Sequence, residues 1–169
     1  FPKGIFVATQ GGDFWLRLLQ NGRYTFTGPE TGWGRALKTA LRINDSILLT
    51  GNHAIAALWN VSTGRLTDTV HKRVTALGLT GNRIYIGSTD GMYEWRNGKL
   101  EKAGGNQQSG LQYRISALCG TADGLMWAGM SADSLLVWNR NTVVAAIPLG
   151  KNIPGSTCKA LFSSGPGTV

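Results

Sequence analysis

The sequence has little cysteine and little histidine. Its 169 residues include only Cys119, Cys158, His53 and His71. Two distant cysteines are too few for a disulfide framework or a zinc site, so we expect two buried or half-buried thiols. The histidines fall in predicted loops and outside any HExxH motif, which argues against a metal site.

Long apolar runs are also missing. Hydrophobic residues make up 42% of the chain and charged residues 15%, yet turn residues interrupt every apolar run well short of the length of a membrane-spanning helix. We therefore expect a folded segment that is not inserted in a membrane. The 24 glycines and six tryptophans among short apolar runs are typical of an all-β protein.

Motifs of catalysis and cofactor binding are absent as well. The sequence has no G-x-S-x-G nucleophile elbow, no phosphate-binding GxxxxGK[ST] loop and no EF-hand loop. Its glycine-rich pieces at 104–105 and 163–167 lack the strand-then-helix setting of a phosphate loop and indicate turns. We predict that this segment is not an enzyme and that it uses no cofactor.

Positive charge exceeds negative charge, with 17 Lys and Arg against 9 Asp and Glu and a net charge of +8. The basic residues are spread from Lys3 to Lys159, and Lys72 and Arg73 form the only adjacent pair. Acidic residues are interspersed among them. A nucleic-acid interface would cluster its cations, so this distribution indicates a solvated basic surface and no nucleic-acid partner.

A repeated pattern is the strongest signal in the sequence. An Ala-Leu dipeptide, a glycine 11 or 12 residues later and a tryptophan 8 or 9 residues after that recur along the chain. The markers are Ala40, Ala76, Ala117 and Ala160, then Gly51, Gly87 and Gly129, then Trp59, Trp95 and Trp138. A period near 40 residues is the signature of a repeat architecture.

Each repeat is predicted to contain four short antiparallel strands. In the clearest unit they are residues 74–80, 83–88, 91–96 and 99–103. Between them lie turn pairs such as Gly81-Asn82 and Asn97-Gly98, which tolerate the positive φ of tight hairpins. Four such strands per repeat predict the blades of a β-propeller. A β-sandwich also has short strands at this spacing, but its unlike strands have no reason to repeat a Gly-to-Trp interval.

The predicted fold is therefore all-β, a β-propeller of about four four-stranded antiparallel blades. The expected units are a partial blade 1–35, three blades at 36–72, 73–113 and 114–156, and the first strand of a further blade at 157–169. The last strand either joins residues 5–27 to close a four-bladed ring or belongs to a larger propeller. We favour a fragment of a larger propeller, whose uncovered faces would self-associate or pack on the rest of a parent chain.

The run "DGLMWAGM" at 123–130 and the run "IYIGSTDGMYEW" at 84–95 carry a family resemblance. The first run resembles the core of two-component regulator propeller repeats, and the second resembles the continuation of that core. The resemblance implies the sensor region of a bacterial hybrid two-component histidine kinase, facing the periplasm and detecting ligands that are often carbohydrates. The segment "ALWNVSTGRL" also resembles a WD-repeat blade, so a WD-like protein-interaction propeller is the alternative.

Candidate ligand contacts lie in the loops that join blades, because a rigid scaffold aims such loops. Trp33 and Tyr113 are aromatic plates suited to stacking on a sugar or a planar ligand, and Arg73, Arg114 and Asn106 supply directional hydrogen-bond donors. These five residues are the predicted site for a small molecule or a glycan.

A second hypothesis concerns the loops between the second and third strands. Their corresponding positions hold Asp13, His53, Asp90 and Asp133. Around a ring these side chains would converge near the axis and form a weak cation-binding or hydroxyl-binding rosette. Asp before Gly or Ser is more often turn chemistry, so we predict no metal ligands.

Overall fold

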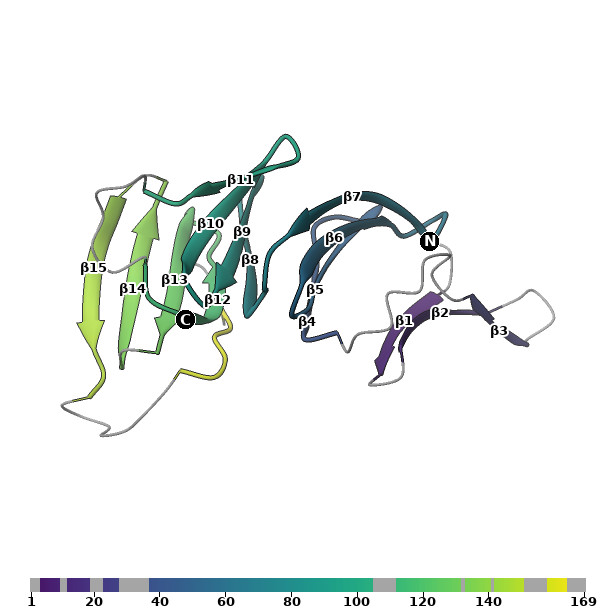
Figure 1. Ribbon diagram of the computed structural model, residues 1–169, viewed down its shortest axis with the longest axis horizontal. Coiled ribbons are helices and arrows are strands. Elements are labelled where there is room, and N and C mark those ends of the chain that lie inside the picture. Colours follow the sequence, from purple (N-terminus) through teal and green to yellow (C-terminus); the bar gives the residue numbers. More distant parts are fainter. Residues whose placement is uncertain are drawn as a thin grey trace.

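The computed structural model describes residues 4–9, 12–18, 23–27, 37–104, 112–131, 133–140, 142–150 and 158–163. These residues form fifteen strands in four antiparallel sheets that follow one another in chain order (Figure 1). Within these ranges the chain forms no helix, and so none that is long and apolar enough to cross a membrane.

The first sheet has three strands and the other three sheets have four each. The first contains β1 (Gly4–Thr9), β2 (Gly12–Leu18) and β3 (Tyr24–Thr27). The second contains β4 (Thr39–Arg42), β5 (Ile47–Gly51), β6 (Ile55–Asn60) and β7 (Arg65–His71). The third contains β8 (Ala76–Thr80), β9 (Arg83–Ser88), β10 (Gly91–Arg96) and β11 (Lys99–Lys102). The fourth contains β12 (Ile115–Gly120), β13 (Leu125–Met130), β14 (Ser134–Asn139) and β15 (Thr142–Pro148).

The all-β class and the four-stranded antiparallel unit are thus confirmed, with one correction to their number. Three sheets have four strands, whereas the sequence predicted about four such units. Residues 158–163, expected as part of a further first strand, carry no strand assignment. A strand is defined by the ladder with its neighbour, and no described segment pairs with these residues.

Local sequence explains the hairpins of the third sheet. β9 and β10 pair from Gly91 opposite Ser88 to Trp95 opposite Ile84. In the turn before β11, Asn97 has φ 48° and Gly98 has φ 74°. Two successive positive φ values match the right-handed twist of the flanking strands, and Asn-Gly is the pair that adopts them at least cost.

Successive sheets meet where a glycine of one sheet faces the start of the next. A Cβ placed on Gly51 would lie 2.7 Å from Val74 Cβ, and one on Gly87 would lie 2.9 Å from Ile115 Cβ. A Cβ on Gly129 would likewise lie 2.6 Å from Cys158 Cβ. Real Cβ atoms do not approach so closely, so each unit needs glycine at this point. Residue 158 therefore occupies the same place after the fourth sheet that Val74 and Ile115 occupy after the second and third.

The three repeated tryptophans also occupy equivalent places. Trp95 and Trp138 are buried on the face that their sheet turns toward the preceding sheet, and Trp59 is buried on the face of its sheet that lies away from the third sheet. Their partners on the second strand of the sheet are Leu48 for Trp59, Ile84 for Trp95 and Met126 for Trp138. The repeated Gly-to-Trp interval thus encodes one apolar layer per interface.

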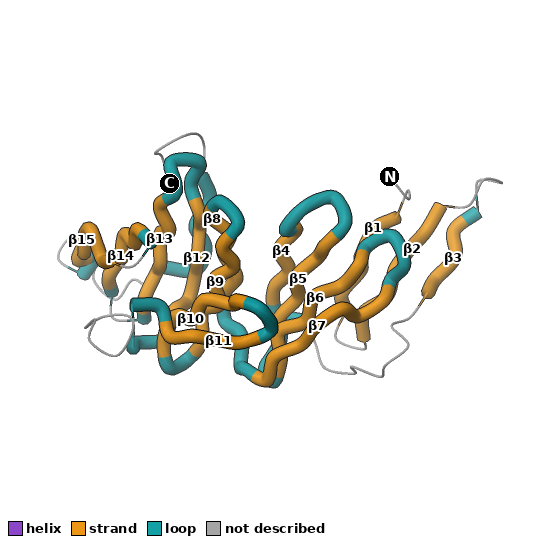
Figure 2. Tube along the Cα trace, turned by 90° about the horizontal axis from the view of Figure 1, so that it is seen from above, coloured by secondary structure: helices purple, strands orange, loops and turns teal. Residues whose placement is uncertain are grey.

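Two apolar cores cover both faces of the third sheet. Tyr85 and Met92 pack toward the fourth sheet, while Ile86 and Trp95 pack toward the second. The first strands β4, β8 and β12 carry the contacts between sheets, with β8 touching both of the others (Figure 2). The sheets are therefore stacked through their first strands.

This topology gives each sheet two distinct ends. The turns between first and second strands and between third and fourth strands lie at one end, which we call the hairpin end. The turns between second and third strands and the links from one sheet to the next lie at the other, which we call the connection end. Of the candidate ligand contacts predicted from the sequence, the described ones, Arg73, Tyr113 and Arg114, belong to the connection end.

Candidate binding site

A hydrogen-bonded cluster of Lys72, Asp90 and Tyr93 lies at the connection end of the third sheet. Lys72 follows β7, Asp90 is in the turn between β9 and β10, and Tyr93 is in β10. The Lys72 ammonium donates to Asp90 Oδ2 at 2.7 Å and to the Tyr93 hydroxyl at 2.8 Å, and the Tyr93 hydroxyl donates to Asp90 Oδ2 at 2.8 Å. The ammonium also lies 4.0 Å from the centroid of the Tyr93 ring. The cluster joins the link between two sheets to a turn of the later sheet.

The protonation states of this cluster are fixed through the neutral range. Burial by itself would raise the pKa of Asp90, but the hydrogen bonds from Lys72 and Tyr93 outweigh it and hold that pKa at about 2. Burial would lower the pKa of Lys72, yet its bonds to Asp90 and Tyr93 raise it. Burial raises the pKa of Tyr93, and its hydrogen bond to Asp90 adds to that rise. None of the three groups is poised to exchange a proton near pH 7, so the cluster is suited to positioning and not to acid–base chemistry.

The loop that carries His53 is held rigidly beside Arg73. Asn52 is buried, and its side-chain oxygen accepts hydrogen bonds from the amides of Ala54 and Ile55 at 2.8 and 2.9 Å. The Asn52 carbonyl accepts a bond from the Val74 amide at 2.8 Å, which places Arg73 next to this loop. Such an Asx turn satisfies the loop backbone locally and fixes its direction.

Cations gather around His53. Desolvation and the positive charges of Lys38 and Arg73 lower the pKa of His53, so the imidazole is neutral at pH 7. Arg73 itself is exposed. This end of the second and third sheets therefore presents cationic donors beside a neutral histidine.

Two more predicted contacts lie at the connection end of the fourth sheet. Tyr113 is 50% exposed and Arg114 is exposed, immediately before β12. The Arg114 carbonyl accepts a hydrogen bond from the Ser131 amide at 3.0 Å, and the Thr75 hydroxyl donates to the Ile115 carbonyl. These bonds fix the backbone that carries Tyr113 and Arg114 and leave both side chains open to solvent.

The structure thus places Arg73, Tyr113 and Arg114 at one end of the sheets, on the links to the third and fourth sheets. Trp33 and Asn106 lie outside the described residues. Sequence reasoning missed Lys72 as a partner of Asp90 and Tyr93; its adjacency to Arg73, as the only adjacent basic pair, was the available signal.

The acidic rosette does not form among the described side chains. Asp90 accepts hydrogen bonds from Lys72 and Tyr93. Asp133 has φ 49°, and its carbonyl accepts a bond from the Leu149 amide, as turn chemistry requires. Asp13 belongs to the part of the chain whose side chains are not described. Within the described ranges no three His, Cys, Asp or Glu residues gather as metal ligands do.

The two cysteines are free thiols. Cys119 and Cys158 are both half-buried, and burial raises the pKa of each. A thiol whose pKa is raised carries little thiolate at neutral pH and is a poor nucleophile. Their structural placement agrees with the half-buried thiols expected from the sequence.

Comparisons with known proteins give the fold. No protein-family model matches the sequence, and no curated protein matches it. The structure is similar to that of the computationally designed protein Ika8, with a TM-score of 0.61 and 19% identity over 83% of this chain and 44% of that chain. It is also similar to Sqt1 of Saccharomyces cerevisiae, with a TM-score of 0.70 and 14% identity over 95% of this chain and 51% of that chain. The chain thus spans about half the length of the two structures that it matches. At these identities the likeness defines a repeated-sheet fold and not an activity.

Proposed function

We propose that the chain is a segment of a β-propeller. The observation that carries this proposal is the recurrence of one close contact, from Gly51 to Val74, from Gly87 to Ile115 and from Gly129 to Cys158. In a propeller each sheet presents the same faces to its neighbours, so equivalent contacts recur. Two observations favour a segment of a larger propeller. Cys158 lies where the next unit would begin, and this chain covers only 44% and 51% of the length of the two similar chains.

The proposed role is a non-catalytic ligand-sensing module of a bacterial hybrid two-component sensor kinase, located in the periplasm. The resemblance of residues 84–95 and 123–130 to two-component regulator propeller repeats supports it. These runs correspond to the β9–β10 hairpin and to β13 with its preceding turn. Gly87 and Gly129, which belong to these runs, make the inter-sheet contacts described above. The two runs therefore share a glycine that packs against the start of the next unit.

The proposed ligand surface is the connection end of the third and fourth sheets. An exposed aromatic ring and adjacent guanidinium groups suit a carbohydrate-type ligand, because sugars stack on aromatic faces and accept hydrogen bonds from fixed donors. Tyr113, Arg114 and Arg73 supply these groups. The Lys72 cluster holds the backbone beside Arg73 in place.

A glycan panel tests this proposal. We expect saturable binding of at least one oligosaccharide, measured by calorimetry, and a loss of roughly tenfold or more in affinity for Tyr113→Ala and for Arg114→Ala. Arg65→Ala is the matched control, because Arg65 is an exposed arginine at the hairpin end of the second sheet. Its affinity should equal that of the unmodified chain.

Three outcomes contradict the proposal. If the Tyr113 and Arg114 variants bind the same glycan as tightly as the control, the connection end is not the ligand surface. If no glycan binds and an immobilised peptide library does, the chain is a WD-like protein-interaction propeller. A flanking gene sequence without a transmembrane helix and a kinase on the C-terminal side excludes the sensor-kinase role.

A further inference from the structure

A cavity lies at the hairpin end, between the third and fourth sheets and away from the predicted ligand surface. Its volume is about 270 Å³, near the lower limit of the ~300 to 1,000 Å³ typical of ligand pockets, so it suits a small molecule. Its lining residues are Thr80, Gly81, Asn82, Arg83, Tyr85, Gly124 and Arg140. They come from the β8–β9 and β12–β13 turns, from the β14–β15 turn and from β8 and β9.

Close contacts between β8 and β12 fix the spacing of the two sheets at the cavity. A Cβ on Gly120 would overlap the Leu79 carbonyl, so β8 and β12 approach as closely as backbones can. The Thr80 hydroxyl donates to the Thr121 carbonyl at 3.4 Å across the same interface. The cavity is therefore a built feature of the sheet interface and keeps its spacing without a ligand.

The cavity is positively charged. Its two charged lining residues are both arginines, Arg83 from β9 and Arg140 from the β14–β15 turn. The nearest carboxylate that pairs with Arg83 is that of Glu94, at 3.8 Å, and Arg96 already holds both oxygens of Glu94 at 2.7 and 2.9 Å. Arg83 also donates to the Arg140 carbonyl at 3.4 Å, which brings the two guanidinium-bearing segments together. Each lining arginine thus keeps donors for a ligand.

Tyr85 adds a buried donor to this wall. Its side chain is fully buried, and its hydroxyl has no hydrogen-bond partner in the described part of the chain. A buried hydroxyl without a partner is costly, and a bound water, ion or ligand is one way in which native structures satisfy such a group. A phenol hydroxyl is a hydrogen-bond donor, so it can donate to the oxygen of an anion.

Arg140 adopts a backbone conformation that disfavours arginine. Its φ is 50°, in the left-handed region, whereas the equivalent turn of the third sheet has Asn97 at φ 48°. Asn tolerates this region better than a long side chain does. Arginine at this position therefore costs conformational free energy that the turn itself does not require. Ligand binding by the arginine side chain in the cavity would account for its presence.

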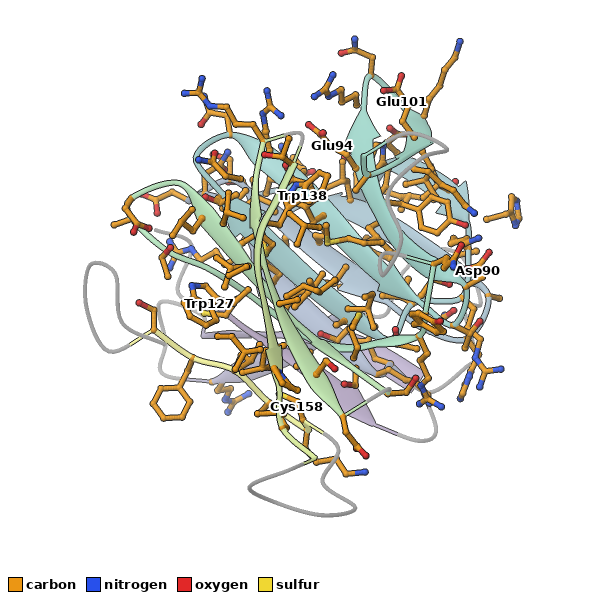
Figure 3. All side chains as sticks on the ribbon, turned by 90° about the vertical axis from the view of Figure 1, so that its left-hand side faces the viewer. Asp90, Glu94, Glu101, Trp127, Trp138 and Cys158 are labelled. Atoms are coloured by element: carbon orange, nitrogen blue, oxygen red, sulfur yellow. The ribbon has the colours of Figure 1, made fainter. Side chains whose placement is uncertain are left out.

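The cavity is separate from the predicted ligand surface at the connection end. In Figure 3 Glu94 and Trp138, which lie on strands of the third and fourth sheets, are near the top of the view, and Asp90 lies apart from them at the right. Asp90 marks the connection end and Glu94 the neighbourhood of the cavity. A ligand in the cavity would thus not overlap a glycan at the connection end.

From this geometry we propose that the cavity binds a small oxyanion, as the carboxylate or phosphate group of a small molecule. Arg83 and Arg140 form charge-assisted hydrogen bonds to its oxygens, and the Tyr85 hydroxyl donates a third bond from the buried wall. The site pins together the third and fourth sheets, because its donors come from both. Ligand binding therefore stabilises this interface.

NMR titration at low ionic strength tests the proposal, with inorganic phosphate and glucuronate as probes and glucose as the neutral control. We expect saturable amide shifts at residues 80–85 and at Gly124 with phosphate, with glucuronate or with both, and none with glucose. A response to glucuronate alone identifies a carboxylate site, and a response to phosphate alone identifies a phosphate site. The absence of shifts at these residues with both anions overturns the proposal.

Variants separate a binding role from a structural one. Arg140→Asn keeps the turn, because Asn97 adopts the same conformation in the third sheet, and we expect it to weaken anion binding at least tenfold. Tyr85→Phe removes the one hydroxyl and should weaken binding roughly tenfold, as loss of a hydrogen bond to a charged group does. Arg65→Asn is the control. Equal anion affinity in Arg140→Asn, Tyr85→Phe and the control contradicts the assignment.

Discussion

Gly87 lies at a close contact between the third sheet and the start of the fourth. A Cβ at this position would lie 2.8 Å from Ile115 Cγ2 and 2.9 Å from Ile115 Cβ. Because both residues belong to packed strands, neither yields easily. We predict that Gly87→Ala lowers the free energy of unfolding by about 1–3 kcal/mol, the usual cost of one extra carbon in a packed core, measured by urea denaturation.

Gly150 provides the matched control for that substitution. A Cβ there would lie 3.6 Å from Asp133 Cβ, at an ordinary contact distance. Gly150→Ala should therefore leave the stability unchanged or raise it slightly by restricting the unfolded chain. Equal effects of the two alanine variants would contradict the view that the repeated glycines are required by close packing.

Asp90 makes the stability of the folded chain depend on pH. Its folded pKa of about 2 lies below its ordinary value of 3.8, so the ionised form is favoured in the folded state. The resulting stability is complete above about pH 4 and is lost as the pH falls toward 2. We predict that Lys72→Met returns the pKa of Asp90 toward 3.8, measured by NMR titration of its carboxyl carbon. An unchanged low pKa in that variant would show that Lys72 is not its cause.

Single residues of the site were only partly predictable from the sequence. Loop position alone indicated Arg73, Tyr113 and Arg114, since these residues fall in links between repeats. The partnership of Lys72 with Asp90 was missed, because the two residues are 18 positions apart and meet only when the β9–β10 turn folds back beside the preceding link.

The β14–β15 turn is the element whose sequence fits its geometry least well. We predict that Arg140→Asn raises the free energy of unfolding in the absence of ligand by about 1 kcal/mol, because Asn adopts a positive φ at lower cost. Thermal denaturation in a buffer without phosphate measures the change. A destabilised variant would mean that the Arg140 side chain supports the turn. The prediction that its backbone conformation costs free energy would then be wrong.

Elements of the third sheet were predicted closely. The strands expected at 83–88 and 91–96 coincide with β9 and β10, because alternation of apolar residues and a tight turn define both ends. The strand expected at 74–80 begins at Ala76. Residues 158–163 have the sequence of a first strand, and Cys158 has the packing position of one, but no described strand pairs with them.

At the scale of the molecule, apolar surface is exposed beyond the fourth sheet. Val144 is 53% exposed and Ile147 is 40% exposed on β15, the edge strand of its sheet, and Phe162 is 76% exposed. Edge strands and apolar patches promote association. We predict that the isolated chain self-associates as its concentration rises, and that Ile147→Lys reduces this, as measured by sedimentation velocity.

Thr142→Lys is the control for that experiment, since it adds the same charge on the same strand at an exposed polar position. It should leave association nearly unchanged. A compact monomer at every concentration would instead favour a ring closed within the chain.

The repeated pattern predicted four-stranded sheets that pack on one another, but it predicted neither the number of four-stranded sheets, which is three, nor the cavity between two of them. The cavity depends on how closely β8 approaches β12, which is decided by Gly120 and Leu79 in three dimensions. Spacing along a sequence carries no such distance. The sequence analysis favoured the loops that join the sheets, at the connection end, whereas the two lining arginines belong to short hairpins at the other end.

Stacking through first strands has a consequence for how such a protein evolves. Among the described residues, the third sheet touches the sheet before it and the sheet after it, and each of these interfaces has one glycine contact and one tryptophan layer. Duplication of a single unit in the gene would therefore insert a new sheet that reproduces both interfaces and disturbs neither neighbour. Lineages can lengthen or shorten such an array by recombination, while a pocket confined to one junction is inherited only where that junction is kept.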